Sequence, residues 1–158
     1  MTRIVVDDLS GEATRDLLAF HHRQMHAASP PGTAFALDLS GLQQPNITVW
    51  TLRDGEAVLG IGALKALPDG TAELKSMRTH PDHLRKGVAG ALLEHIIAEA
   101  KARGLTRLSL ETGAGPAFEP ALTLYRMRGF IEGEAFGDYV AVADSGFNRF
   151  FHLTLASA

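Results

Sequence analysis

The segment RTHPDHLRKGVAGALLEHI, residues 78–96, places a basic, glycine-containing loop directly before an apolar-striped helix. The amino end of a helix presents unpaired backbone N–H groups and the positive end of the helix dipole, and phosphates bind there. Gly87 and Gly90 let the backbone approach a ligand closely. Arg85 and Lys86 add positive charge. The pattern suits a diphosphate, but glycine-rich loops also match by chance, so a solvated loop without a ligand stays equally open.

Two common phosphate-binding loops do not fit this segment. The mononucleotide P-loop needs a glycine four residues before a Gly-Lys-Ser/Thr sequence, and the chain has no such sequence. The dinucleotide fingerprint needs three glycines in an early strand–helix–strand unit, whereas here two glycines follow an antiparallel hairpin. The loop is therefore of neither type.

An antiparallel sheet is predicted ahead of the loop. Two β-rich runs, residues 47–53 and 57–67, are separated by an Asp-Gly pair, which is a strong hairpin signal. A second turn leads into a third strand at 72–79. In this strand the apolar Leu74 and Met77 are three residues apart, which breaks strict alternation and predicts a β-bulge between them.

Helices and strands alternate in the second half of the chain. Apolar residues recur at every fourth position after Gly87, which predicts an amphipathic helix, and Gly104 ends it. A helix that joins two strands makes them parallel with a right-handed crossover, so one α+β domain, residues 1–158, is predicted. Outside the hairpin and third strand, the main predicted elements are strands at 3–6, 106–112, 130–134 and 150–155 and helices at 88–103 and 119–129.

A helix at 11–28 and an irregular segment at 29–46, with one short helix, precede the hairpin. The irregular segment is the best place for a substrate-specific element. His21, His22 and His26 cluster on the helix, and the last two have the spacing of a zinc-binding pair. No third ligand can be named, so a polar helix face lining a cleft is the simpler interpretation, and the role of the cluster stays open.

Composition excludes several classes of protein. The chain has 158 residues, of which 46% are hydrophobic and 21% charged, as in a globular protein with a sizeable core. A net charge of −3 and the lack of an aromatic–basic pattern argue against a nucleic-acid binder. The absence of cysteine, of an apolar run that spans a bilayer and of a signal peptide favours a cytoplasmic protein without a membrane partner.

Two signatures together resemble the GNAT superfamily of acyl-CoA-dependent N-acyltransferases. The family's pyrophosphate loop reads Gln/Arg-x-x-Gly-x-Gly/Ala, and residues 84–89, LRKGVA, match it at Gly87 and Ala89 but depart from it at Leu84. The second signature, a helix ending in aromatic-x-x-x-Gly-Phe, is matched by LYRMRGF at 124–130. Their order and spacing are more specific than either alone. Further stretches, among them SPPGTAFALDLSGLQQPNITVW and FGDY, are similar to a bacterial group of small, mostly uncharacterised N-acetyltransferases.

The resemblance implies a fold and a co-substrate. The fold is a mixed sheet of six to seven strands with an antiparallel N-terminal part, a central splayed parallel pair and helices on both faces. The co-substrate is acetyl-CoA, and no metal is expected. The pantetheine arm runs beside the third strand, where main-chain groups polarise the thioester carbonyl. The residues expected to bind acetyl-CoA are Met77, Arg78 and Thr79 on this strand and Arg85, Lys86, Gly87, Val88, Ala89 and Gly90 at the diphosphate.

The resemblance also implies direct transfer of the acetyl group to an amine, without a covalent enzyme intermediate. Tyr125 is expected to act as the acid for the leaving thiolate. Glu73 is the first candidate base, and Glu111 is a second candidate or a counter-charge for the amine; a water chain is the other option. Each also has a structural interpretation, since tyrosines pack in cores and strand carboxylates commonly face solvent.

The expected acceptor is a small-molecule or amino-acid-like amine, which the sequence does not identify. The alternative function is a non-catalytic acyl-CoA-binding module that regulates a partner. The C-terminal segment FNRFFHLTL, residues 147–155, is predicted to form an aromatic-rich edge strand that could pair between subunits in a homodimer.

Overall fold

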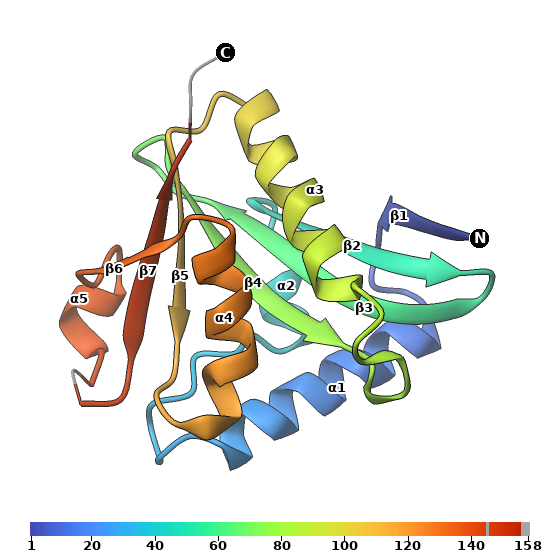
Figure 1. The fold of residues 1–158 in the computed structure, drawn as a ribbon, viewed down its shortest axis with the longest axis horizontal. Helices are drawn as coiled ribbons and strands as arrows, with labels where there is room; N and C mark the ends of the chain where they lie inside the picture. The colour runs from blue at the N-terminus through green and yellow to red at the C-terminus, as the bar shows by residue number, and fades with distance from the viewer. Residues whose placement is uncertain (145, 156–158) are drawn as a thin grey trace.

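A mixed sheet lies at the centre of the protein, with helices on both of its faces (Figure 1). The computed structural model describes residues 1–144 and 146–155. In these residues the sheet has seven strands in the order β1-β2-β3-β4-β5-β7-β6, which confirms the predicted α+β class. The strands are β1 (Thr2–Val6), β2 (Ile47–Asp54), β3 (Ala57–Ala66), β4 (Ala72–Thr79), β5 (Arg107–Thr112), β6 (Ile131–Gly133) and β7 (Arg149–Thr154).

The helices pack on the sheet through two main hydrophobic clusters. Leu93, Ile96 and Leu122 belong to the cluster between the sheet and α3 and α4. Leu17 and Leu42 belong to the cluster that joins α1 and α2 to the opposite face, which we call the α1 face. The helices are α1 (Glu12–Ala27), α2 (Leu39–Leu42), α3 (Val88–Ala102), α4 (Glu119–Met127) and α5 (Tyr139–Val142), with short 3-10 turns at Pro81–His83 and Pro116–Phe118.

A β-bulge interrupts β4 where the sequence predicts it. Between the pairs Ala63–Lys75 and Ile61–Arg78, β4 advances three residues while β3 advances two. Ser76 takes up the extra residue with a positive φ of 57°. A bulge of this kind bends the strand and changes the side to which later side chains point.

The parallel strands β4 and β5 separate soon after they meet. They pair only at Ala72–Leu108 and Glu73–Ser109 and then diverge in a V, with α4 lying across its opening (Figure 1). The remainder of β4 bonds to β3 alone, so its other edge carries backbone groups without a strand partner. This is the predicted splayed parallel pair.

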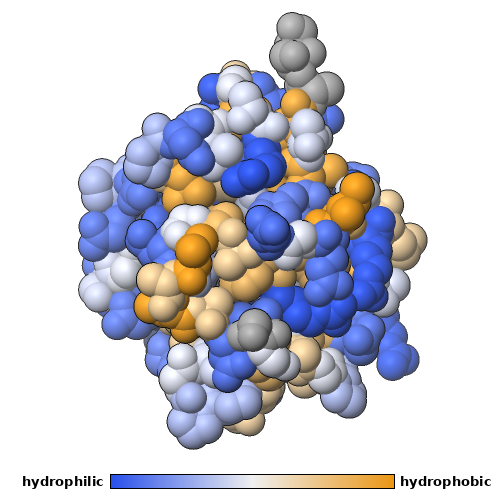
Figure 2. All heavy atoms as spheres, turned by 90° about the vertical axis from the view of Figure 1, so that its left-hand side faces the viewer, coloured by the Kyte–Doolittle hydropathy of each residue, from blue (hydrophilic) through white to orange (hydrophobic). Residues whose placement is uncertain are grey.

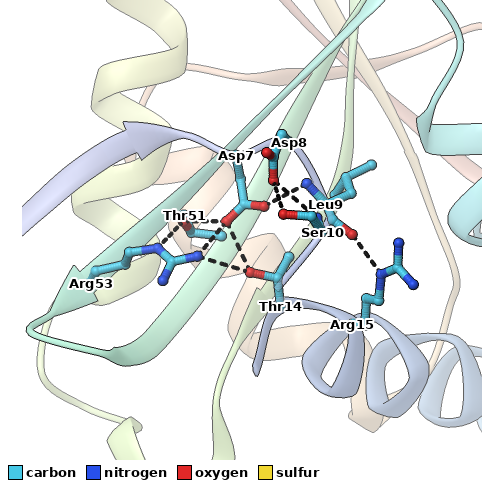
Figure 3. A network of polar contacts seen from close by, with 8 residues as sticks. All are labelled: Asp7, Asp8, Leu9, Ser10, Thr14, Arg15, Thr51 and Arg53. Carbon is cyan, nitrogen blue, oxygen red and sulfur yellow. Dashed lines mark hydrogen bonds and ion pairs between the residues drawn. The ribbon is translucent and has the colours of Figure 1, made fainter. Parts of the chain in front are cut away.

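A buried network fixes the start of α1 on the sheet (Figure 3). Burial alone would raise the pKa of Asp7, but its hydrogen bonds, above all the one from Arg53, outweigh burial and lower the pKa. The carboxylate thus joins β1, β2 and α1. It accepts hydrogen bonds from the Leu9 N–H (2.8 Å), Thr14 Oγ1 (2.9 Å), Thr51 Oγ1 (2.9 Å) and Arg53 Nη2 (2.7 Å).

Two features differ from the sequence prediction. The aromatic C-terminal strand β7 is not an edge strand, because it lies between β5 and β6 and pairs with both. The short helix α5 was not predicted, since four residues carry no helical period. In the part of the chain that the structure describes, no helix is long and apolar enough to cross a membrane.

Candidate active site

The amino end of α3 has the geometry that anion binding requires. Gly87 precedes the helix with φ of 78°, and no side chain caps it. The first helical hydrogen bond runs from the Ala91 N–H to the Gly87 oxygen at 3.0 Å. The amides of Val88, Ala89 and Gly90 come before this bond, so they have no acceptor within the helix. Their N–H groups are therefore available to a ligand.

Three basic side chains lie near the start of α3. Arg85 and Lys86 are exposed beside Gly87. The Lys86 ammonium lies 3.2 Å from His83 Nδ1. A Cβ atom at Gly90 would lie 3.0 Å from the Arg128 guanidinium, so the helix start is close to the end of α4. Arg128 is itself paired with Glu94 of α3.

A cavity at the opening between β4 and β5 brings the three predicted catalytic side chains together. Glu73 reaches it from β4, Glu111 from β5 and Tyr125 from α4. Residues from the end of α1 and from the segment after it close the other side. The residues from Arg85 to Gly90 do not line this cavity, although Met77 and Arg78 do. The structure thus places the catalytic candidates at one site and the anion loop at another.

Tyr125 is buried and packs against Phe130, with ring centroids 5.7 Å apart. Burial raises the pKa of Tyr125 to about 12, and the positive charge of Arg78 only partly offsets it. The phenol therefore stays protonated at neutral pH. It can donate a hydrogen bond to an anion that forms in the cavity.

Glu73 is buried rather than turned to solvent, and two groups engage its carboxylate. Lys75 Nζ lies 3.1 Å from Glu73 Oε2, and the Tyr139 hydroxyl donates to the same oxygen at 2.5 Å. The Lys75 ammonium also donates to the Tyr139 hydroxyl at 2.9 Å. Burial and the neighbouring Glu73 raise the pKa of Tyr139 well above its ordinary value, so this phenol keeps its proton.

Glu111 has fewer partners. The Asn148 side chain donates to its Oε2 at 3.0 Å. Burial raises the pKa of Glu111 from 4.5 to about 7, while the hydrogen bond from Asn148 and the charge of Lys75 act in the opposite direction. The carboxyl group is thus poised to gain or lose a proton near neutral pH.

The β4 residues expected to bind acetyl-CoA lie where one edge of the strand has no strand partner. The Met77 side chain packs against the central core. The Arg78 Nε donates to His21 Nδ1 at 3.0 Å, which directs the guanidinium toward α1. Thr79 does not line the cavity. Ser76 does, and its buried hydroxyl has no hydrogen-bond partner among the described residues.

Four residues of the site were missed by sequence reasoning: Lys75, Ser76, Tyr139 and Asn148. Lys75 is two residues from Glu73, so strand alternation could have placed both on one face. Tyr139 belongs to the FGDY stretch, which was used only as a sign of family likeness. No local pattern marks Ser76 or Asn148 as site residues.

The model of the acetyltransferase (GNAT) family matches residues 12–130, a span that contains both the anion loop and Tyr125.

The chain belongs to the GNAT acetyltransferase family.

Relatives of known sequence support the same assignment. This acetyltransferase is 46% identical over 155 residues to the uncharacterized N-acetyltransferase YedL of Escherichia coli, covering 98% of this chain and 96% of the relative. It is 48% identical over 136 residues to the uncharacterized N-acetyltransferase YsnE of Bacillus subtilis, covering 86% and 90%. These findings confirm the predicted class, an acetyl-CoA-dependent N-acetyltransferase.

The fold is also shared with a solved enzyme. The ribosomal-protein-S18-alanine N-acetyltransferase from Escherichia coli superposes with a TM-score of 0.72 at 24% identity. The alignment covers 100% of this chain and 96% of that one. At this identity the likeness concerns the fold and not the acceptor.

The histidines of the acetyltransferase do not assemble a metal site in the described residues. His21 is buried, and burial lowers its pKa to about 3, with a further contribution from Arg78. It therefore acts as a neutral acceptor for Arg78. The His22 and His26 rings pack against each other at a tilt, with centroids 4.4 Å apart. No group of three or more His, Asp or Glu side chains that could hold a metal occurs in this part of the chain.

Proposed function

We propose that the protein transfers the acetyl group of acetyl-CoA directly to the amine of a small-molecule or amino-acid-like acceptor. One observation carries this proposal: the cavity in which Glu111 and Tyr125 face the unpaired edge of β4. An extended pantetheine arm can add to such an edge as a further strand. The free amides at the start of α3 supply a place for the diphosphate.

Glu111 is the better candidate for the base. A base must have a free lone pair and a pKa near the working pH. The Glu73 carboxylate already accepts hydrogen bonds from a cation and a phenol. Glu111 has a pKa of about 7 and one amide donor. In this proposal Glu111 takes the amine proton, and Glu73 holds Lys75 and Tyr139 in place.

The transfer also requires stabilisation of the carbonyl oxygen and of the leaving thiolate. As the amine nitrogen bonds to the thioester carbon, negative charge develops on the carbonyl oxygen, and an N–H of the bulged part of β4 or the Ser76 hydroxyl can donate to it. The C–S bond breaks and the thiolate leaves beside Tyr125. A thiol has a pKa of about 8.5, well below the value of about 12 for Tyr125, so the phenol stabilises the thiolate by a hydrogen bond rather than by complete proton transfer.

Replacement of Gly87 by Glu tests the anion loop. A Cβ at Gly87 or at Gly104 would meet nothing within 4 Å, and the two glycines have similar φ values of 78° and 76°. Gly104→Glu is therefore a matched control with the same strain and charge at the other end of α3. Calorimetry should show that Gly87→Glu abolishes acetyl-CoA binding and that Gly104→Glu does not. Equal affinity in both variants would overturn the assignment of the loop.

Release of the CoA thiol tests the enzymatic function. A panel of small primary amines should raise the rate of thiol release above background hydrolysis, and mass spectrometry should find the acetylated amine. If acetyl-CoA binds but no amine is acetylated, the non-catalytic acyl-CoA-binding module becomes the better description.

A further inference from the structure

A second cavity lies on the α1 face and shares part of its wall with the first. Phe35, Glu73 and Lys75 line both cavities. The second has a volume of about 700 Å³, within the range of about 300–1,000 Å³ that small-molecule sites occupy. An acceptor in this cavity would therefore approach the proposed reaction centre from the side opposite α3 and α4.

Two cations of the second cavity have no counter-ion. Lys65 of β3 and Arg107 of β5 both line it and are half-buried. Neither forms an ion pair with a described residue. The Nε of Arg107 is buried and has no hydrogen-bond partner among these residues. A buried unsatisfied donor is costly, and a bound anion would satisfy it.

The carboxylates around this cavity leave the two cations available. Asp69 is exposed and accepts hydrogen bonds from the N–H and hydroxyl of Thr71. Asp138 is exposed on the loop before α5. Glu73 is engaged by Lys75 within the shared wall. Asp69 and Asp138 also form no ion pair with a described residue, but both are exposed, and the charge of Arg107 contributes to the lowered pKa of Asp69. Among the half-buried charged side chains that line the cavity, Lys65 and Arg107 are the two without an ion pair to a described residue.

Apolar side chains form part of the remaining wall, which also contains the polar Asn46, Thr71 and Tyr139. Leu37, Leu67, Phe136 and Val142 contribute to it. On the side of the molecule where α5 and β6 lie, hydrophobic residues gather and hydrophilic residues surround them (Figure 2). The cavity therefore suits a molecule with an apolar body and one anionic end.

The sheet register sets the distance between the anionic end and the reaction centre. Arg107 is two residues from Ser109, the partner of Glu73, and four residues from Glu111. At about 3.3 Å per residue these offsets are about 7 Å and about 13 Å along the strand. These are offsets between backbone positions, and the long side chains of Arg107 and Lys65 shorten the span. An acceptor with several atoms between its amine and carboxylate therefore fits the span better than an α-amino acid, which has one carbon between them.

We infer that the acceptor is an amphiphilic amine with a carboxylate at the end remote from the amine, and that Arg107 and Lys65 bind this carboxylate. The inference rests on the proposed function, because it places the acceptor amine at the Glu111 side of the shared wall. Arg107 and Lys65 are specificity residues in this scheme and take no part in the proton transfers.

A pair of isosteric acceptors tests the inference. In para-methylbenzylamine a methyl group replaces the carboxylate of para-(aminomethyl)benzoate, and the two amines are otherwise the same. With the wild-type protein, KM for the acid should be at least tenfold lower than KM for the neutral amine. Arg107→Gln and Lys65→Gln should each raise KM for the acid about tenfold, with kcat and the KM for the neutral amine nearly unchanged. Arg3→Gln, an exposed strand arginine on β1, is the matched control and should change neither.

A binding measurement separates this inference from the proposed function. The non-reactive para-toluate should bind to the wild-type protein by calorimetry, and Arg107→Gln should weaken this binding about tenfold. If no amine is acetylated but para-toluate binds in this way, the proposed function fails and the carboxylate site stands. If the two amines have equal KM values, or if para-toluate binding is absent or insensitive to Arg107, the inference is wrong.

Discussion

Replacement of Glu111 by Gln should lower activity and remove a pH dependence near neutrality. With a pKa of about 7, about a tenth of Glu111 is ionised at pH 6 and about nine tenths at pH 8, so the base form rises almost tenfold. With the ordinary pKa of 4.5 it would already be almost fully ionised at pH 6. Loss of a general base typically slows a reaction by about 10²–10⁴-fold. The wild-type kcat/KM should therefore rise about tenfold over this range, and that of Glu111→Gln should be low and flat.

The assay must distinguish the titration of the base from the titration of the acceptor amine. Thiol release should be followed with an arylamine acceptor, which is already neutral throughout this pH range. Glu73→Gln is the control, because it removes a nearby carboxylate but keeps Glu111. Since the charge of Glu73 contributes to the raised pKa of Glu111, an inflection should remain but at a lower pH than in the wild type. An unchanged inflection in Glu111→Gln, or a flat wild-type profile, would refute the role of Glu111.

Replacement of Glu111 by Gln should lower activity but make the folded protein more stable at high pH. A carboxyl group whose pKa is raised by folding stabilises the protein below its unfolded pKa, and this stability is lost as pH rises through the folded pKa. A rise from 4.5 to about 7 corresponds to at most about 3 kcal/mol. Gln stays neutral, so Glu111→Gln should be more stable than wild type at pH 8 by up to this amount and nearly equal at pH 4. Urea unfolding at both pH values measures the difference, and a destabilised variant at pH 8 would contradict the assigned cause.

Two further substitutions test other parts of the structure. Tyr125→Phe should lower kcat about 10²-fold, the typical effect of removing one donor to a developing anion, while calorimetry finds acetyl-CoA affinity unchanged; an unchanged kcat would exclude the hydroxyl from catalysis. Asp7→Asn should cost about 3 kcal/mol at neutral pH because it leaves Arg53 without its buried partner. Folding lowers the pKa of Asp7, so the wild-type protein loses the same stabilisation when Asp7 is protonated at low pH. The difference in unfolding free energy between wild type and Asp7→Asn should therefore shrink as pH falls. Urea unfolding that gives the same difference at every pH would show that the charge is not responsible.

Much of the fold follows from local patterns that the chain carries in its sequence. The period of apolar residues predicts α3, and the glycine at its start has the positive φ that side chains avoid. The Asp-Gly pair gives the β2–β3 hairpin, and the broken alternation of β4 gives the bulge at Ser76. These features depend on residues close in sequence, so their neighbours suffice to predict them.

The position of the C-terminal strand in the sheet could not be predicted from local patterns. Its aromatic alternation predicts a strand at 150–155, but nothing in the segment says which strands will flank it. In the structure β7 inserts between β5 and β6, and it pairs with the edge of β5 that faces away from β4. The edge predicted for pairing between subunits is therefore buried within the sheet.

The sequence by itself determined the family and predicted the anion loop and the residue types of the proposed reaction centre. Only the tertiary structure decided the state of those residues. Tyr139 meets Glu73 across 66 residues of sequence, and that contact occupies the carboxylate that sequence reasoning preferred as the base. The pKa of Glu111 rises because distant segments remove water from it, and desolvation depends on the packing of the whole chain rather than on any local pattern.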